Sequence, residues 1–282
     1  MSSAIIIKKA DGADETFQSE KLVSSLLRSG ADKQSAEKVL FELEPELKSG
    51  MTTEEIYRKA FDTLKRMRRE VAARYTLKRA LTELGPSGYP FEKFVAKVFE
   101  AEGFKTQTGI VLEGACASHE VDMVAWNGEK TLFAEMKFHN HHSYKTDLKV
   151  ALYVKARMDD LKAASAKMAG QGQSEIEEGW LITNTKFSRT AIDYAKCAGL
   201  SLLGWSYPKE NNLRNLVDKA GIHPITVLTT LDKREKQELL RRNVVLCSEI
   251  KNNASLLSES GVAKGKIDDV QEEAALVCGV NV

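Results

Sequence analysis

The stretches His119-Glu120-Val121-Asp122 and Phe133-Ala134-Glu135-Met136-Lys137, separated by an Asn127-Gly128 turn, decide the fold of the central part of the chain. Polar and apolar residues alternate in both, which is typical of β-strands, whose side chains point to opposite faces in turn. Asn-Gly between two such segments predicts a hairpin, because both residues readily adopt a positive φ. We therefore expect paired strands over 119–126 and 131–138.

This hairpin would bring acidic and basic side chains together. Glu135 and Lys137 share one face of their strand, whereas Ala134 and Met136 share the other, buried face. Folding back the preceding strand places Asp122 beside Glu135. Two carboxylates suit Mg²⁺ (or Mn²⁺), which proteins hold with one or two carboxylates together with water and phosphate. The pattern predicts a site for phosphodiester hydrolysis, with a cross-strand salt-bridge face as the alternative.

The segments around the hairpin predict a mixed sheet flanked by helices. Apolar spacing and turn signals give the order α-β-β-β-α-β-α-β. The expected helices cover 91–103, 147–168 and 188–198, and the expected strands cover 105–112, 119–126, 131–138, 180–183 and 200–205. A Gly-, Gln- and acid-rich stretch over 169–178 is expected to be a loop.

This central region, 86–207, resembles the Mrr-like branch of the PD-(D/E)xK nuclease superfamily. The resemblance rests on Tyr89-Pro90-Phe91-Glu92-Lys93-Phe94, Val121-Asp122, Ala134-Glu135-Met136-Lys137 and Ile182-Thr183-Asn184. It implies a metal-dependent nuclease, with Asp122 and Glu135 as metal ligands and Lys137 as a catalytic residue. It also implies an additional metal-binding or activating acid at Glu92. The Gln-x-x-x-Tyr element of the family is not evident after Lys137, since Gln171 and Gln173 fall in the expected loop.

Three histidines, His139, His141 and His142, follow the lysine of this motif. Such spacing is compatible with zinc, but no nearby cysteine or second cluster completes a zinc site. A polar lip over the cleft and an exposed turn are the other interpretations.

The first 85 residues predict a different kind of domain, a hairpin followed by helices. Strands over 5–9 and 15–17 surround an Asp11-Gly12 turn, and helices follow over 20–29 and 32–47, from Thr52 onward, and over 70–84. This region resembles an ATP-cone, the regulatory module of ribonucleotide reductases. The matching stretches begin at Ile7, Glu15, Gly50 and Val71.

The ATP-cone resemblance implies a regulatory site for ATP or dATP. Lys9 and Lys21 would bind the triphosphate, with Lys8 beside them, and Glu15 to Gln18 would face the base. Thr53 and Arg74 are further candidates for contact with base or phosphate. The alternative is that the two adjacent lysines protect an exposed edge strand.

Two further regions carry weaker sequence signals of function. Residues 58–79 hold nine basic and two acidic residues, including Lys65, Arg66, Arg68 and Arg69. They predict either a solvated helix face or a surface for phosphate or a second subunit. Residues 208–282 predict a helical region. Its 261–267 turn weakly resembles a helix-hairpin-helix, and a dimerisation or capping element is the alternative.

Composition limits the possible functions. The 282 residues include 41 basic and 40 acidic side chains, so the net charge of +1 excludes a polybasic binder. The four cysteines (Cys116, Cys197, Cys247 and Cys278) form no C-x-x-C pair, which excludes a cysteine zinc finger. No signal peptide or long apolar span is evident, so we expect a cytoplasmic protein without a membrane partner.

The sequence thus predicts an α+β or α/β protein of three parts, 1–85, 86–207 and 208–282. We expect a nucleotide-regulated, Mg²⁺-dependent endonuclease that acts on DNA as a homo-oligomer. Two alternatives stay open. One is a non-catalytic, nucleotide-responsive DNA-binding regulator on a nuclease fold, and the other is an RNA nuclease, because a metal site recognises only phosphate.

Overall fold

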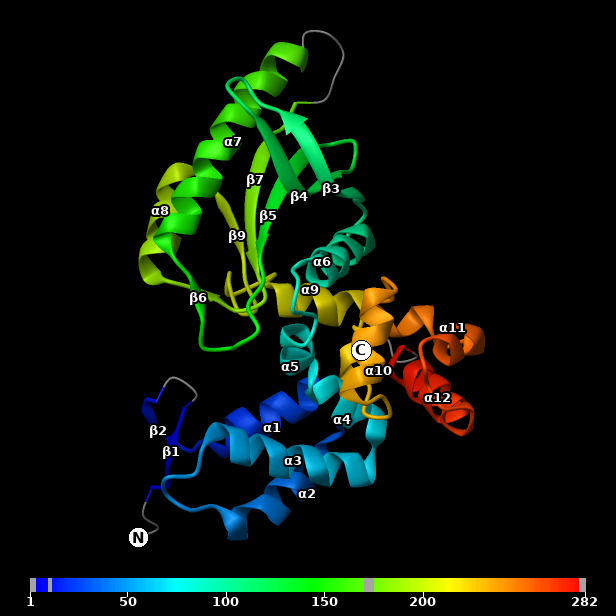
Figure 1. Cartoon of the computed structure of the whole chain (residues 1–282). Helices are drawn as coiled ribbons and strands as arrows, with labels where there is room; N and C mark the ends of the chain where they lie inside the picture. Colours follow the sequence, from blue (N-terminus) through cyan, green and yellow to red (C-terminus); the bar gives the residue numbers. More distant parts are fainter. Residues whose placement is uncertain (1–3, 10–11, 170–174, 279–282) are drawn as a thin grey trace. The chain divides into compact units, whose positions relative to one another are not determined.

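The computed structural model describes residues 4–9, 12–169 and 175–278. The chain divides into two compact units (Figure 1). We call Leu81–Ile222 the sheet unit, and Met1–Ala80 together with His223–Val282 the helical unit. The region predicted as a separate carboxy-terminal part is therefore divided. Its first residues, 208–222, belong to the sheet unit, and the remainder folds with the amino-terminal helices.

A five-stranded mixed sheet forms the centre of the sheet unit, in the order β3-β4-β5-β7-β9. The first three strands are antiparallel neighbours, and β7 and β9 continue the sheet in parallel. The strands are β3 (Lys105–Glu113), β4 (Ser118–Trp126), β5 (Thr131–Lys137), β7 (Glu178–Thr183) and β9 (Ser201–Leu203). The predicted order of helices and strands is confirmed. Two short strands, β6 (Lys145–Thr146) and β8 (Lys186–Phe187), form a separate parallel pair that the sequence did not predict.

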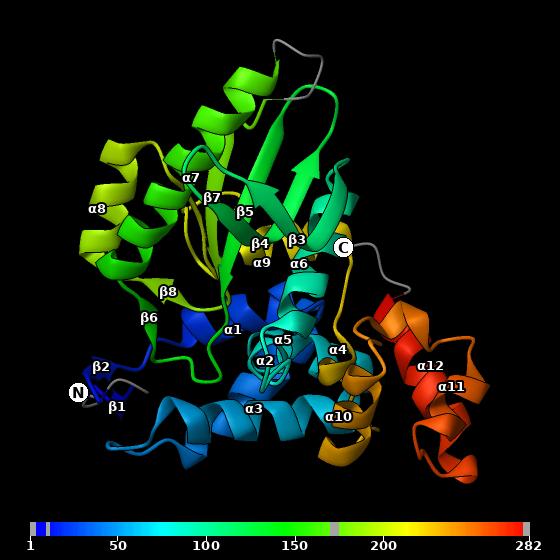
Figure 2. The same cartoon turned by 45° about the horizontal axis from the view of Figure 1, so that its top comes forward.

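Helices cover both faces of this sheet (Figures 1 and 2). On one face, α7 (Leu148–Ala169) and α8 (Arg189–Ala198) bury Val154, Leu161 and Ala191 against Phe133 of β5. On the other face, α6 (Tyr89–Ala101) packs against β3 and β4, and α9 (Leu213–Ala220) packs against α6.

The central strand β5 is consequently buried on both faces, not on one as predicted. Strands with parallel partners are usually covered on both sides, because the crossover helices pack on the sheet faces. Glu135 is therefore only 5% exposed, although it shares its face with Lys137. The alternation of residues indicates which side chains share a face, but not whether a helix covers that face.

The helical unit begins with the predicted hairpin, β1 (Ile6–Lys8) paired with β2 (Asp14–Thr16). Its amino-terminal helices are α1 (Ser19–Arg28), α2 (Lys33–Leu43), α3 (Thr53–Met67), α4 (Arg69–Tyr75) and the start of α5 (Leu77–Thr82), with a 3₁₀ turn, η1 (Glu44–Glu46), after α2. The predicted start at Thr52 is a capping box, in which the Thr52 hydroxyl accepts from Glu55 N at 3.1 Å and the Glu55 carboxylate accepts from Thr52 N at 2.8 Å.

The single helix predicted over 70–84 is instead divided between α4 and α5. The division lies at Thr76, whose hydroxyl donates to the Ala73 carbonyl at 2.7 Å. Threonine side chains compete in this way with the backbone hydrogen bonds of a helix.

The carboxy-terminal residues complete the helical unit. They form α10 (Lys233–Arg241), α11 (Ala254–Glu259), α12 (Ile267–Cys278) and the 3₁₀ turns η2 (Ile225–Val227), η3 (Cys247–Glu249) and η4 (Lys264–Lys266). Helix α12 packs against α4, and the Thr226 hydroxyl donates to the Ala80 carbonyl at 2.8 Å. These contacts explain why residues from 223 onward fold with the amino-terminal helices. Among the described helices, none has the length and apolar character needed to span a bilayer.

Candidate active site

Asp122 lies where the sheet opens between its antiparallel strands. The ladder between β4 and β5 ends at the pair Met123–Ala134. One residue further, the Asp122 Oδ2 atom accepts a hydrogen bond from Met136 N at 2.5 Å, in place of a backbone carbonyl. On the other side, the register of β3 places Gly109 opposite Asp122, and its φ of +61° interrupts that ladder as well. Glycine adopts a positive φ at no steric cost because it has no Cβ atom.

Glu135 is held by two cations. Lys137 Nζ donates to its Oε1 atom at 3.0 Å, and Arg157 Nη1 of α7 donates to its Oε2 atom. The parallel pairing of Glu135 with Leu181 in β7 fixes this stretch of the strand. The predicted convergence of Asp122, Glu135 and Lys137 is thus present in the fold, although it includes a second basic residue.

Glu92 joins these carboxylates from the first turn of α6. Burial, together with the negative charges of Asp122 and Glu135, raises the pKa of Glu92 to about 7. Burial, followed by the charge of Glu135, also raises the pKa of Asp122. Burial and the mutual repulsion of these carboxylates thus both favour the protonated forms of Glu92 and Asp122.

The donor set fits a divalent cation such as Mg²⁺. Within the described part of the chain, no group of three or more acidic, histidine or cysteine side chains is arranged to hold an ion. Asp122 and Glu135 would supply two hard carboxylates, and other positions around an ion would be left to water and phosphate. This arrangement is usual for Mg²⁺.

Sequence reasoning missed Arg157. The only signal was that it interrupts an apolar helical stripe, at the position between Val154 and Leu161. It is 7% exposed, and its second terminal nitrogen, Nη2, donates to the Glu120 carbonyl.

The loop after Lys137 is fixed by Asn184, a fully buried residue at the end of β7. Its amide accepts from His139 N at 2.9 Å and donates to the His139 carbonyl at 2.7 Å. The rings of His141 and Tyr144 lie 5.7 Å apart, and Tyr144 is 55% exposed. Among the described residues, the fold brings no group of three or more acidic, histidine or cysteine side chains together around these histidines, so it does not complete the zinc site that their spacing would allow. Gln171 and Gln173 lie outside the described residues.

The raised pKa of Glu92 predicts a pH-dependent gain in stability for Glu92→Gln. With a pKa of about 7 against an ordinary 4.5, ionisation of Glu92 opposes folding. The contribution of Glu92 to the free energy of unfolding is therefore most favourable below pH 4.5, and it is lost as the pH rises through 7. For this half-buried group we expect metal-free Glu92→Gln to gain about 1–2 kcal/mol at pH 8 and nothing at pH 4.5. Urea unfolding in EDTA measures this, and equal stabilities of variant and wild type at pH 8 would contradict it.

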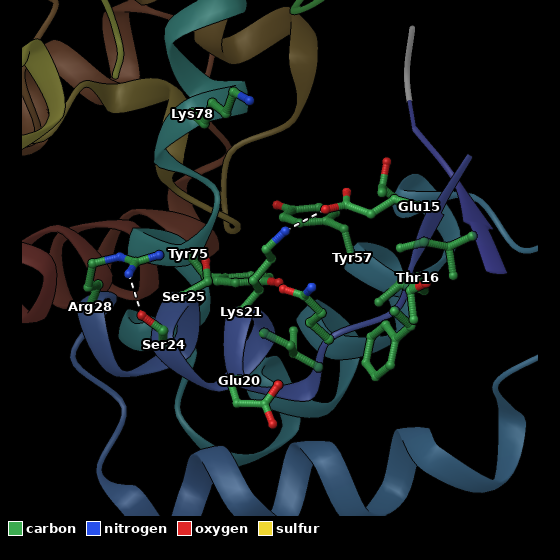
Figure 3. Close-up of a pocket in the computed structure, with 16 residues that line it drawn as sticks. Glu15, Thr16, Glu20, Lys21, Ser24, Ser25, Arg28, Tyr57, Tyr75 and Lys78 are labelled. Carbon is green, nitrogen blue, oxygen red and sulfur yellow. Dashed lines mark hydrogen bonds and ion pairs between the residues drawn. The ribbon is translucent and has the colours of Figure 1, made fainter. Parts of the chain in front are cut away.

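A cleft lies within the helical unit, between the hairpin and the adjoining helices (Figure 3). Its volume is about 800 Å³, which is in the range of small-molecule sites. Six predicted nucleotide contacts line it: Glu15, Thr16, Phe17, Gln18, Lys21 and Thr53. Sequence reasoning missed Ser24, Ser25, Arg28, Tyr57, Tyr75 and Lys78.

Charge and aromatic contacts shape this cleft. Hydrogen bonds from Lys21 and from Lys9, which lies 2.8 Å away, lower the pKa of Glu15 to about 2. Tyr57 and Tyr75 stack with their ring centroids 5.0 Å apart. Figure 3 shows Lys78 extending from α5 on the side of the cleft opposite the hairpin.

Three predicted contacts, Lys8, Lys9 and Arg74, do not line the cleft, although Lys9 pairs with Glu15, which does. Arg74 is 6% exposed, and its Nε atom donates to the Ser29 carbonyl at 3.1 Å, because its face of α4 points into the core. Lys8 is a β1 residue whose backbone N donates to the Met51 carbonyl at 2.8 Å, and it does not line the cleft.

The basic run that begins at residue 58 is partly neutralised by acidic neighbours. Arg66 pairs with Glu42 at 2.9 Å, and Arg68 pairs with Glu70 at 2.9 Å. Neither arginine lines the cleft. These pairs favour a solvated helix face over a phosphate-binding surface at Arg66 and Arg68.

Comparison with known families agrees with this geometry. The restriction endonuclease family (Mrr catalytic domain) matches residues 85–205, and the family described as AF1548-like, C-terminal, matches residues 223–278. The first match confirms the predicted Mrr-like domain. Neither match reaches residues 1–84, where the ATP-cone stays a prediction.

Two relatives are themselves without assigned functions. An uncharacterised protein of Archaeoglobus fulgidus is 36% identical over 186 residues, which is 100% of that protein and 66% of this chain. A crystal structure described as the protein of unknown function AF1548 has a TM-score of 0.55 and 35% identity, and the alignment covers 99% of that chain and 68% of this one. Because it matches such relatives over their whole length, the chain belongs to the AF1548-like family, with a restriction endonuclease domain at residues 85–205.

Proposed function

We propose that this protein is a divalent-metal-dependent endonuclease that hydrolyses DNA phosphodiester bonds under the control of an adenine nucleotide. The single observation that supports catalysis best is the convergence of Asp122, Glu135 and Lys137 where β4 separates from β5. The restriction endonuclease match over the same residues favours this chemistry over a chance salt bridge.

Each residue of the site has a distinct task in this proposal. Asp122 and Glu135 hold the ion, which when bound would lower the pKa of a water molecule and offset charge on the phosphate. Lys137, whose side chain is 35% exposed, is accessible enough to donate to the scissile phosphate or orient the attacking water. Glu92 is close enough to influence the same carboxylates and is the candidate activating acid.

The nucleotide would bind in the cleft of the helical unit. Lys21 offers a cation for phosphate, and the stacked Tyr57 and Tyr75 offer aromatic surface in the cleft for contact with a base. Glu15 is paired with Lys21, so a triphosphate would compete with that carboxylate for the ammonium group.

Control by a nucleotide requires two states that bind it differently. We propose that these states are assemblies of different size, because two nuclease units facing one duplex can cut both strands. Linkage then requires that concentrating the favoured assembly tightens nucleotide binding.

One experiment tests the whole proposal. Cleavage of DNA and of RNA is followed in Mg²⁺ across ATP and dATP titrations, with light scattering on the same samples. We expect DNA to be cut and both the rate and the mass to change with nucleotide. Cleavage of RNA alone would support the RNA nuclease, and DNA binding without cleavage would support the regulator. A rate and a mass that stay flat through saturation would contradict nucleotide control.

A further inference from the structure

Arg157 is a buried cation at the centre of the candidate site. Its side chain is 8% exposed, whereas that of Lys137, the other cation on Glu135, is 35% exposed. Its two terminal nitrogens donate to Glu135 Oε2 and to the Glu120 carbonyl. The guanidinium therefore links β4 to β5 at the point where these strands separate.

Helix α7 fixes the position of this guanidinium. Asp160, one turn beyond Arg157, accepts from Cys116 N at 2.7 Å and from Ala117 N at 3.2 Å, and its Oδ2 atom lies 2.7 Å from His119 Nε2. The ring of Tyr153, one turn before, lies 5.3 Å from the guanidinium carbon. The helix is thus anchored to the start of β4, so Arg157 has little freedom to leave Glu135.

The two cations on Glu135 differ in kind. Arginine is planar and always charged, and it fixes the plane of a carboxylate, whereas lysine is a flexible point charge. Arg157 is the buried partner of Oε2, and Lys137 is the more exposed partner of Oε1. Asp122 has a similar asymmetry, since Met136 N occupies its Oδ2 atom.

We propose that Arg157 is a positioning residue, which keeps its hydrogen bond to Glu135 Oε2 when the divalent ion binds. The ion would then bind Oε1 and the remaining Asp122 oxygen, and Lys137 would leave Oε1 and become available to the substrate. This inference rests on the proposed function and goes beyond it, because it assigns the stable counter-ion of Glu135 to a residue outside the motif. Outer partners of metal ligands typically change metal affinity or activity by 10- to 100-fold when they are replaced.

The test measures binding of Mn²⁺ alone by calorimetry, without substrate, on full-length protein. We expect Arg157→Met to weaken Mn²⁺ binding by about 10- to 100-fold. Arg157→Lys keeps a positive charge but loses the planar fork, so we expect a smaller loss, of about 10-fold. Lys155→Met is the matched control, because Lys155 lies on the same helix and pairs with Asp159, a residue that does not belong to the candidate site. We expect wild-type affinity from the control.

The conservative variant Arg157→Lys distinguishes an effect on folding from an effect on metal binding. Circular dichroism gives the folded fraction to which each affinity is normalised, and Arg157→Lys serves if Arg157→Met does not fold. Wild-type Mn²⁺ affinity in folded Arg157→Lys would overturn the positioning role while leaving the metal site intact. Absence of Mn²⁺ binding in the wild type, or binding unaffected by Asp122→Ala, would overturn the proposed metal site and the role of Arg157 with it.

Discussion

Asp122→Ala is expected to reduce the rate of DNA cleavage by on the order of 10³-fold or more. A bound metal ion contributes several kcal/mol of transition-state stabilisation, and a loss of about 4 kcal/mol corresponds to ~10³ in rate. The variant removes one of the two carboxylates that the motif supplies. Initial rates on a DNA duplex in Mg²⁺ measure the effect.

Two further variants separate chemistry from folding. Asp122→Asn keeps an oxygen that can accept from Met136 N, so it should fold like the wild type and still lose activity. Asp193→Ala removes an exposed carboxylate of α8 that pairs with Arg189, and it should cleave normally. Cleavage by Asp122→Asn at the rate of Asp193→Ala would contradict a metal-binding role for Asp122.

Lys21→Ala is expected to weaken ATP or dATP binding by about 1.5–3 kcal/mol, the usual contribution of a hydrogen bond to a charged group. This corresponds to roughly a 10- to 150-fold rise in Kd. Lys21 lines the cleft, and its ammonium group, like that of Lys9, pairs with Glu15. Calorimetry with each nucleotide measures the change, and adding Lys9→Ala should weaken binding further.

The control for the nucleotide site is Lys33→Ala. Lys33 is an exposed lysine of α2 that lies 3.8 Å from Glu37 and does not line the cleft. It should bind nucleotide like the wild type. Equal nucleotide affinities of Lys21→Ala and Lys33→Ala would contradict the assignment of Lys21 as a phosphate contact. They would also contradict the ATP-cone interpretation of this cleft.

Much of the sheet unit was predictable because its signals are local. Alternating residues and the Asn127-Gly128 turn predicted β4 and β5, and the same pattern placed Asp122 beside Glu135. Face sharing along a strand depends only on the two-residue period of its side chains.

The remaining features depend on contacts between distant residues. The arginine at 157 reaches Glu135 across 22 positions, and the amide of Asn184 reaches His139 across 45. The periodicity of one stretch of sequence does not indicate which side chains of a distant stretch will contact it. The burial of Glu135 has the same origin, since helices from elsewhere in the chain cover its strand.

The boundary of the helical unit was missed for a related reason. Residues 208–282 have a helical pattern, but the pattern does not indicate which core the helices share. Helix α12 packs on α4, nearly two hundred positions earlier in the chain, as shown by their contact in the fold. Amphipathic helices specify an apolar face, and only packing selects the partner of that face.

The most direct test of the central claim is cleavage of supercoiled plasmid DNA by the purified wild-type protein in Mg²⁺, in EDTA, and by Asp122→Asn in Mg²⁺. We predict conversion to nicked or linear DNA in the first reaction alone. Cleavage that persists in EDTA, or that Asp122→Asn performs at the wild-type rate, would contradict a metal-dependent nuclease built on Asp122, Glu135 and Lys137.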